Sequence, residues 1–328
     1  MPRKTKSFAG PLSAVSTVRN FVDVMKEMSF DDERAQAEKL PRLLVLAEDV
    51  ETGQRIGSVL TGLDRSPAIT AVRLDAARND IDQYDVVIVY DPASGKSFAD
   101  VRRMSAQSGV HVFDLADYSD HDGEWASAIR SRIAGQLPGL APALGRWFKP
   151  FRPAATKAVI DETARVNAQF ALVSNLPAVI PIFGSLASAG ADFFVLTKNQ
   201  LMMIFKLAAI NGRDLRDQWS LMREMLPVVG AGLALRTVAR EASSFLPFAA
   251  GTIPKMAIAY SGTMAAGWAA DFYYQVGQKP TKEQWSLYYK QAGTAFKRFE
   301  RPAFSGFPKM PFSGPKKEVS EPGSDPAP

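Results

Sequence analysis

Apolar positions follow two different patterns along the chain. In the first half, short apolar runs rich in β-branched residues alternate with segments whose apolar residues recur at helical spacing. The runs predict four strands, at 42–47, 68–74, 84–90 and 110–116. The segments with helical spacing predict three helices, at 52–61, 97–108 and 124–137. Alternating strands and helices of this length predict a small parallel sheet with crossover helices. We therefore expect an α/β domain of Rossmann-like or P-loop-like character.

The second half is more apolar. Residues 166–191 run for roughly 26 positions without a charge, which is long enough for one helix to cross a bilayer. Because Pro177, Pro181 and Gly184 interrupt this run, it is better interpreted as two helices that meet at a tight bend. A second apolar block covers 226–270. Both a compact hydrophobic helical bundle and a membrane-embedded hairpin have this pattern, and the sequence leaves the choice open.

These patterns divide the chain into five predicted parts. The first is a basic lead with helices that pack on the following domain, the second is the α/β domain, and the third is a linker rich in proline and aromatic residues. The fourth is an apolar helical domain, whose last helix begins at a capping box formed by Thr281 and Gln284. The fifth is a tail rich in proline, glycine, serine and lysine, which we expect to be disordered. In order, the parts cover 1–40, 41–138, 139–153, 154–299 and 300–328.

Charge is distributed unevenly. The formal net charge is +5, but 41–140 carries about −5 and 141–328 about +9. Basic excess beside apolar blocks favours an anionic lipid surface over nucleic acid, because the basic residues are scattered and no recognition motif accompanies them. The chain has no cysteine and two histidines, which excludes disulfides and thiol nucleophiles and argues against a metal site. We predict no cofactor, no metal and no catalytic residue.

The loop after the first predicted strand resembles a degenerate P-loop. A P-loop places glycines, a lysine and a hydroxyl residue around phosphates. Here Gly53 is kept, but Glu48 stands where the first glycine belongs, and Gln54 and Arg55 replace the lysine and the hydroxyl residue. A carboxylate at that point would repel phosphate. The sequence therefore predicts a nucleotide site that has lost its phosphate ligands.

The remaining nucleotide motifs are also incomplete. A base-reading N-K-x-D motif would fall at Asp114–Asp117, where Leu115 replaces the lysine. The tetrapeptide at 94–97, SGKS, lacks the first glycine of a P-loop, and we expect Ser94 or Ser97 to cap a helix instead. In an alternative, receiver-like interpretation, Glu48, Asp49 and Asp91 converge at strand ends and hold magnesium.

The predicted linker interleaves basic and aromatic side chains. Such segments occur at membrane interfaces, where rings lie at headgroup depth and cations meet phosphates. The candidate interface residues are Arg146, Trp147, Phe148, Lys149, Phe151 and Arg152. The alternative is an interdomain linker whose aromatic rings cover the helical bundle.

Several blocks in the helical half carry a family resemblance. The stretches NAQFALVSNLPAVIPIFG, DFFVLTKNQLMMIFKLAAINGRDL, PVVGAGLALRTVARE and PKMAIAYSGTMAAGWAADFYY occur in this order within 154–277. This pattern resembles the YcjF-type, GTPase-associated helical domain, a bacterial family of unknown function that is regarded as membrane-associated. Such domains often follow a GTPase domain, in agreement with the degenerate P-loop upstream. The resemblance supplies no catalytic residues.

Together these features predict a non-enzymatic, membrane-associated adaptor with a pseudo-GTPase domain. We expect it at the cytoplasmic side of an inner membrane, integral or peripheral, with membrane lipids, a membrane protein or a GTPase as partner and no nucleic acid. The alternative location is the cytoplasm. The alternative functions are a residual GTPase or other NTPase, and a soluble interaction module with a receiver-like α/β domain.

Overall fold

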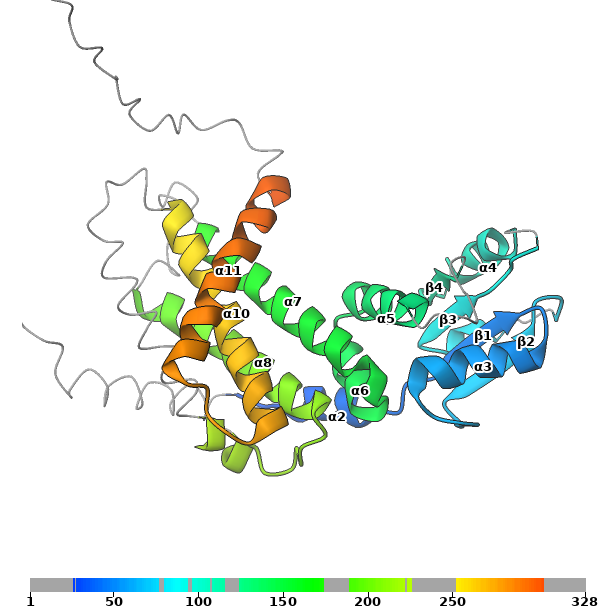
Figure 1. Cartoon of the computed structure of the whole chain (residues 1–328), viewed down its shortest axis with the longest axis horizontal. Helices are drawn as coiled ribbons and strands as arrows, with labels where there is room; N and C mark the ends of the chain where they lie inside the picture. The colour runs from blue at the N-terminus through cyan, green and yellow to red at the C-terminus, as the bar shows by residue number, and fades with distance from the viewer. Residues whose placement is uncertain are drawn as a thin grey trace, which may run out of the picture.

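The computed structural model describes most of the chain as two parts, an α/β domain and a helical domain (Figure 1). The described residues are Lys26 and the ranges 28–76, 80–93, 96–106, 108–115, 124–173, 189–221, 223–225 and 252–303. The first 25 residues of the basic lead and the tail beyond residue 303 lie outside them. All statements below concern the described residues.

Four parallel strands form the sheet of the α/β domain. They are β1 (Leu43–Ala47), β2 (Ile69–Arg73), β3 (Val86–Val89) and β4 (His111–Asp114). The spatial order is β2-β1-β3-β4, and every neighbouring pair is parallel. Leu43 is level with Ile69 on one side and with Val86 on the other. The predicted four-stranded parallel sheet is thus confirmed.

Helices cover both faces of this sheet. On one face, α3 (Val50–Thr61) and α5 (Glu124–Gln136) pack on β1 and β3, and Ile56 and Ile129 share a core with Val45. On the other face, α4 (Ser97–Ser105) and the short 3-10 helix η1 (Ile81–Gln83) cover alternate strand residues. Because successive side chains of a strand point to opposite faces, Leu43 and Val45 belong to the first core and Leu44 and Leu46 to the second.

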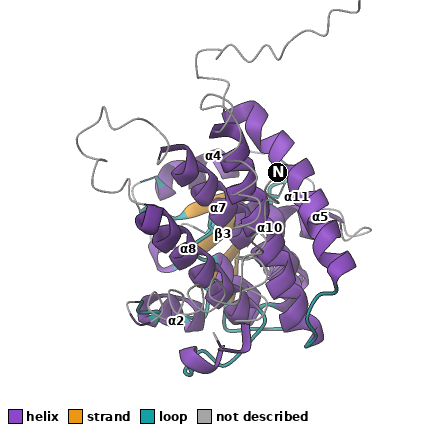
Figure 2. Ribbon diagram, turned by 90° about the vertical axis from the view of Figure 1, so that its left-hand side faces the viewer, coloured by secondary structure: helices purple, strands orange, loops and turns teal. Residues whose placement is uncertain are grey.

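The helical domain is larger, and Figure 2 shows how small the sheet is beside the helices. Its elements are α6 (Ala141–Trp147), η2 (Lys149–Phe151), α7 (Arg152–Val173), α8 (Ala189–Ile210), α10 (Thr252–Val276) and α11 (Lys282–Ala303). They enclose one apolar core, which includes Val159 of α7, Ile204 of α8, Ala269 of α10 and Phe296 of α11. An α/β domain followed by a helical domain is therefore what the structure has.

Helices α7 and α10 run antiparallel and approach closely at a glycine. A Cβ atom on Gly267 would lie 2.7 Å from Cγ1 of Ile160, so only glycine permits this approach without a shift of the isoleucine. The small residues Gly262, Ala266 and Ala270 recur at every fourth position of α10, a spacing that permits helices to approach closely. Ala266 and Ala270 are buried in the core, but a Cβ atom on Gly262 would meet no atom within 4 Å.

Local chemistry fixes two helix ends. Ile210 is the last residue of α8, and Gly212 follows it with a φ of 73°; the N–H groups of Gly212 and Arg213 donate to the carbonyls of Ala209 and Ala208. This is the Schellman arrangement, which requires a left-handed residue. At the start of α11, Gln284 Oε1 accepts from Thr281 N at 2.8 Å, and Gln284 N donates to Thr281 Oγ1 at 3.3 Å. The predicted capping box is therefore present.

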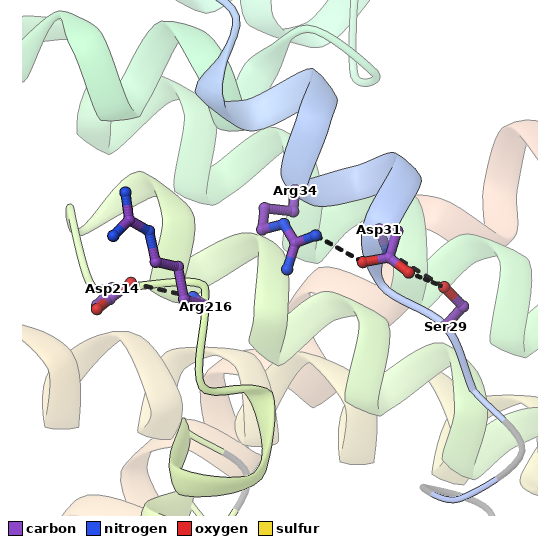
Figure 3. A network of polar contacts seen from close by, with 5 residues as sticks. All are labelled: Ser29, Asp31, Arg34, Asp214 and Arg216. Atoms are coloured by element: carbon purple, nitrogen blue, oxygen red, sulfur yellow. Dashed lines mark hydrogen bonds and ion pairs between the residues drawn. The ribbon is translucent and has the colours of Figure 1, made fainter.

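Helix α2 (Asp31–Glu38) belongs to the helical domain and not, as the sequence suggested, to the α/β domain. Phe30, just before α2, is fully buried and its ring centroid lies 4.8 Å from that of Phe205 in α8. Figure 3 shows α2 beside the loop that follows α8 and carries Asp214 and Arg216; Arg34 is bonded to Asp31 of α2 itself. After α2 the chain continues directly into β1 of the α/β domain. Lys39, which follows α2, pairs through Nζ with Asp85 Oδ1 at 3.0 Å, and this ion pair holds the end of α2 against the α/β domain.

No helix among the described residues is both long and apolar enough to cross a bilayer. The centres of the two apolar blocks, at 174–188 and 226–251, lie outside the described residues.

Candidate functional site

The carboxyl edge of the sheet is where the sequence predicts a degenerate nucleotide site and, in the receiver-like alternative, a magnesium site. Because all four strands are parallel, their carboxyl ends meet at this edge, and in open α/β sheets ligands bind there. Glu48 and Asp49 follow β1, and Asp91 follows β3, its neighbour in the sheet. The structure therefore places these acids at the ends of adjacent strands.

Asp49 caps the N-terminus of α3. Its Oδ1 accepts from Thr52 N at 2.7 Å, and its Oδ2 accepts from Thr52 Oγ1 at 2.9 Å. These bonds, with the charge of Arg55 nearby, lower the pKa of the Asp49 carboxyl below its ordinary value. In a P-loop this helix end faces a phosphate. Here the chain's own carboxylate bonds the free N–H groups, so an incoming phosphate would meet a negative charge.

The second helix end at this edge is occupied in the same way. Asp91 Oδ2 accepts from Ser97 N at 3.0 Å, at the start of α4. The cap is therefore an aspartate from the end of the preceding strand, whereas the sequence suggested Ser94 or Ser97. Ser97 is the first residue of α4, and Ser94 and Gly95 lie outside the described residues.

Gly53 serves packing. A Cβ atom on it would lie 3.0 Å from Cβ of Ala71 and 3.6 Å from the carbonyl of Val45, so the glycine lets α3 lie close on the sheet. Glu48, Gln54 and Arg55 are exposed. Asp114 ends β4, and its carbonyl accepts from Arg132 Nη1 at 3.0 Å. Asp117 lies outside the described residues.

Within the described part of the chain, no three His, Asp or Glu side chains come together as metal ligands. Asp49 and Asp91 are instead engaged by helix N-termini, so these two members of the predicted acidic set already serve as caps.

We expect the Asp49 cap to make stability depend on pH in the acid range. A lowered pKa in the folded state means that the carboxylate stabilises the fold above about pH 4 and that this contribution is lost as the pH falls through the folded-state pKa. Asp49→Asn keeps a neutral cap. The melting temperature of the wild type should exceed that of D49N at pH 7, and the difference should be smaller at pH 3, as measured by thermal unfolding. A difference that is the same at both pH values would contradict this role.

The aromatic residues of the predicted linker do not form one surface. Phe148 and Phe151 are fully buried in the core of the α/β domain, with ring centroids 6.1 Å apart. Neither ring is available to a lipid surface or covers the helical bundle. Trp147 is 43% exposed. The linker is thus an ordered joint between the domains, and Pro150 lies so close to Gly62 that a Cβ there would approach its Cγ to 2.8 Å.

The basic residues of this joint have different roles. Arg146 Nη1 donates to the carbonyl of Arg213 at 2.8 Å, which fastens α6 to the loop after α8. Lys149 is exposed, and Arg152 donates from Nε to the carbonyl of Gly145 at 3.3 Å. Lys149 and Arg152 also line a hollow with a volume of about 1270 Å³.

This hollow is a cationic groove along α7, α10 and α11. Tyr260, Met264 and Trp268 lie one helical turn apart on α10 and contribute its apolar lining. Five basic side chains and two acidic ones line it: Lys149, Arg152, Lys157, Arg165 and Arg298, with Asp161 and Asp271. We call this set the cationic groove.

Both acids of the cationic groove are engaged. Lys157 Nζ pairs with Asp161 Oδ2. Asp271 accepts from Thr156 Oγ1 at 3.3 Å, from Asn211 Nδ2 at 3.2 Å and from Gln275 Nε2 at 2.7 Å. The side chains of Lys149, Arg165 and Arg298, by contrast, make no hydrogen bond or ion pair with another described residue. Three cations are therefore open to an anionic ligand.

The groove is elongated. Arg152 and Arg165 are separated by 13 residues of one helix, or about 20 Å. Since α7 and α10 are antiparallel, Arg165 lies near Tyr260, while Arg152 and Lys157 lie toward Asp271. The cations are spread over a length that exceeds one phosphate group.

Comparison with known proteins adds no relative: no family model, no curated protein and no solved structure matches the chain. The resemblance to the YcjF-type helical domain therefore stays a prediction.

Sequence reasoning found Lys149 and Arg152 but missed Arg165, Arg298 and Asp271. The spacing of Lys157, Asp161 and Arg165 marks one polar face of a helix. This spacing does not reveal that the face borders a groove, because the groove also needs α11, which is more than a hundred residues away in the sequence.

Proposed function

We propose that the protein is a non-enzymatic, membrane-associated adaptor with a pseudo-GTPase α/β domain. The observation that carries the non-enzymatic part is the pair of self-capped helices: Asp49 and Asp91 bond the helix N-termini at the carboxyl edge of the sheet. Phosphoryl transfer depends on positioning and on neutralising phosphate charge. The carboxylates at both helix ends are negative, so they would repel a phosphate group instead of neutralising its charge.

The strand order supports a Rossmann-like ancestry for this domain. The order β2-β1-β3-β4 is that of the first four strands of flavodoxin-like, doubly wound sheets, whose ligands bind where the order reverses, between β1 and β3. Asp49 and Asp91 follow these two strands. We infer that the fold retains the place of a nucleotide site while its own carboxylates occupy the helix ends.

The cationic groove supports the membrane part of the proposal. Lys149, Arg165 and Arg298 are exposed cations that form no hydrogen bond or ion pair with another described residue, and Trp147, two positions before Lys149 in the sequence, is 43% exposed. A row of cations about 20 Å long can meet several lipid headgroups at once. Each Lys or Arg near an anionic surface contributes about 1 kcal/mol of attraction. We therefore place the protein peripherally on an anionic leaflet, with the groove facing the headgroups.

Flotation with lipid vesicles tests this proposal. The full-length protein should float with vesicles that contain phosphatidylglycerol and phosphatidylcholine but not with phosphatidylcholine alone, and salt should release it. The double variant K149E/R298E should bind at least about tenfold more weakly. K282E/K290E, with the same charge change on exposed positions of α11 that do not line the groove, should bind within about threefold of the wild type.

Two results would overturn the proposal. If K149E/R298E and K282E/K290E bound anionic vesicles equally well, the cationic groove would not be the membrane-binding surface. Micromolar binding of GTP or ATP by calorimetry would restore the nucleotide site that the self-capped helices argue against.

A further inference from the structure

Strand β4 is an edge strand of the sheet and lies between two helices. It pairs with β3 on one side, and Figure 1 shows it between α4 and α5. Flavodoxin-like sheets continue past this position with a fifth strand. After β4, the chain described here continues into α5 and the helical domain without another strand in the described residues.

The outward backbone groups of β4 can be assigned from its register. Leu115 N donates to the carbonyl of Val89 in β3, so Leu115 and the alternate residues Phe113 and His111 direct their backbone groups toward β3. Val112 and Asp114 therefore direct theirs away from the sheet. The outward carbonyl of Asp114 accepts from Arg132, in agreement with this assignment.

A hollow of about 420 Å³ follows this edge. Phe98 and Arg102 of α4 line it on one face of the sheet, and Arg132 and Gln136 of α5 line it on the other. The two arginines are exposed, and none of the described residues that line the hollow has a carboxylate side chain. The edge thus combines outward backbone groups with a positive charge above and below the sheet.

We propose that β4 binds an extended, acidic segment of a partner protein, which adds a fifth strand to the sheet. Main-chain hydrogen bonds to the outward groups of Val112 would supply affinity, as in other strand-addition complexes. Adjacent side chains of a strand point to opposite faces. Two consecutive acidic residues therefore reach Arg102 on one face and Arg132 on the other.

The charges also argue against a second copy of this chain at the edge. Pairing β4 with β4 would bring Arg102 and Arg132 of both copies together, and like charges across such an interface disfavour association. The inference rests on the adaptor role proposed above, for which it supplies the protein partner. It does not depend on membrane binding.

The probe is a fluorescein-labelled octapeptide with two adjacent glutamates at its centre and valines on both sides. Its matched control has lysines in place of the glutamates. We expect the full-length protein to bind the glutamate peptide with a Kd of tens of micromolar and the lysine peptide at least about tenfold more weakly. Hydrogen exchange at the amides of Val112 and Asp114 should slow on binding.

Two variants make the test specific. Val112→Pro removes an outward N–H without removing a ladder bond and should abolish peptide binding while the far-UV circular dichroism is kept. Arg102→Glu should weaken binding of the glutamate peptide and strengthen binding of the lysine peptide. Equal affinity for the two peptides, no protection of the two amides, or unchanged peptide preference in R102E would each overturn the proposal.

Vesicle flotation separates this outcome from failure of the membrane proposal. V112P and R102E should float with anionic vesicles as the wild type does. A protein that floats but ignores the peptides refutes strand addition alone, and one that binds the glutamate peptide but does not float refutes the membrane surface alone.

Discussion

Alanine in place of Phe151 is expected to lower the free energy of unfolding by about 3–5 kcal/mol. Phe151 is fully buried: it has 0% accessible surface and packs in the core of the α/β domain beside Phe148. Removing the ring leaves a cavity at the joint where η2 meets α3. Urea unfolding of the full-length protein measures the change.

Trp147→Ala is the matched control for this prediction. Trp147 lies four residues earlier in the same basic and aromatic segment, but it is 43% exposed. Its replacement should change stability by less than about 1 kcal/mol. If F151A were as stable as W147A and lost vesicle binding instead, Phe151 would be a membrane contact and the packing described here would be wrong.

Alanine in place of Asn167 is expected to lower the free energy of unfolding by about 2–3 kcal/mol. Asn167 is fully buried in α7 and links three helices. It donates from Nδ2 to Thr263 Oγ1 of α10 at 2.9 Å and accepts from Asn199 Nδ2 of α8 at 2.8 Å. Its removal leaves the half-buried Asn199 amide without this acceptor and the buried Thr263 hydroxyl without this donor, and unmet buried hydrogen-bonding groups cost more than the bond contributes.

Gln169→Ala serves as the control for Asn167. Gln169 is exposed two residues further along α7, and its replacement should change stability by less than about 0.5 kcal/mol. Thermal and urea unfolding of both variants give the comparison. A loss in N167A no larger than that in Q169A would show that the bonds between α7, α8 and α10 do not contribute to the fold.

The elements that the sequence predicted well are those with strong local signals. The four strands appear within two residues of the predicted bounds because each is a short apolar run bounded by polar residues. Helix α8 ends at Gly212 and α11 begins after Thr281, where a glycine and a capping box mark the termini by local chemistry. Helix α11 extends to Ala303, slightly beyond the predicted end.

Features that depend on distant residues could not be predicted. A buried and an exposed aromatic residue look alike in the segment at 146–152. Only the tertiary packing of η2 on α3 and α5 distinguishes buried Phe151 from exposed Trp147. Likewise, Phe30 gave no sign that it would pack on Phe205 of α8, which lies far from it in the sequence. The cationic groove requires α7, α10 and α11 together, and Arg298 joins it through folding alone.

The sequence motif predicted the degenerate nucleotide site, but only the hydrogen bonds in the structure show what occupies the helix N-terminus there. The substitutions at Glu48, Gln54 and Arg55 indicated lost phosphate ligands. They did not indicate that Asp49 bonds the helix N-terminus itself, because capping depends on backbone geometry at the strand end.

Fractionation of cells that express the full-length protein tests the account most directly. Membranes are sedimented and washed first with high salt and then with carbonate. A peripheral adaptor held by the cationic groove should sediment with membranes and be released by salt, since exposed charge pairs are screened. Retention through both washes would contradict the groove as the attachment site, and a protein that never sediments with membranes would contradict membrane association itself.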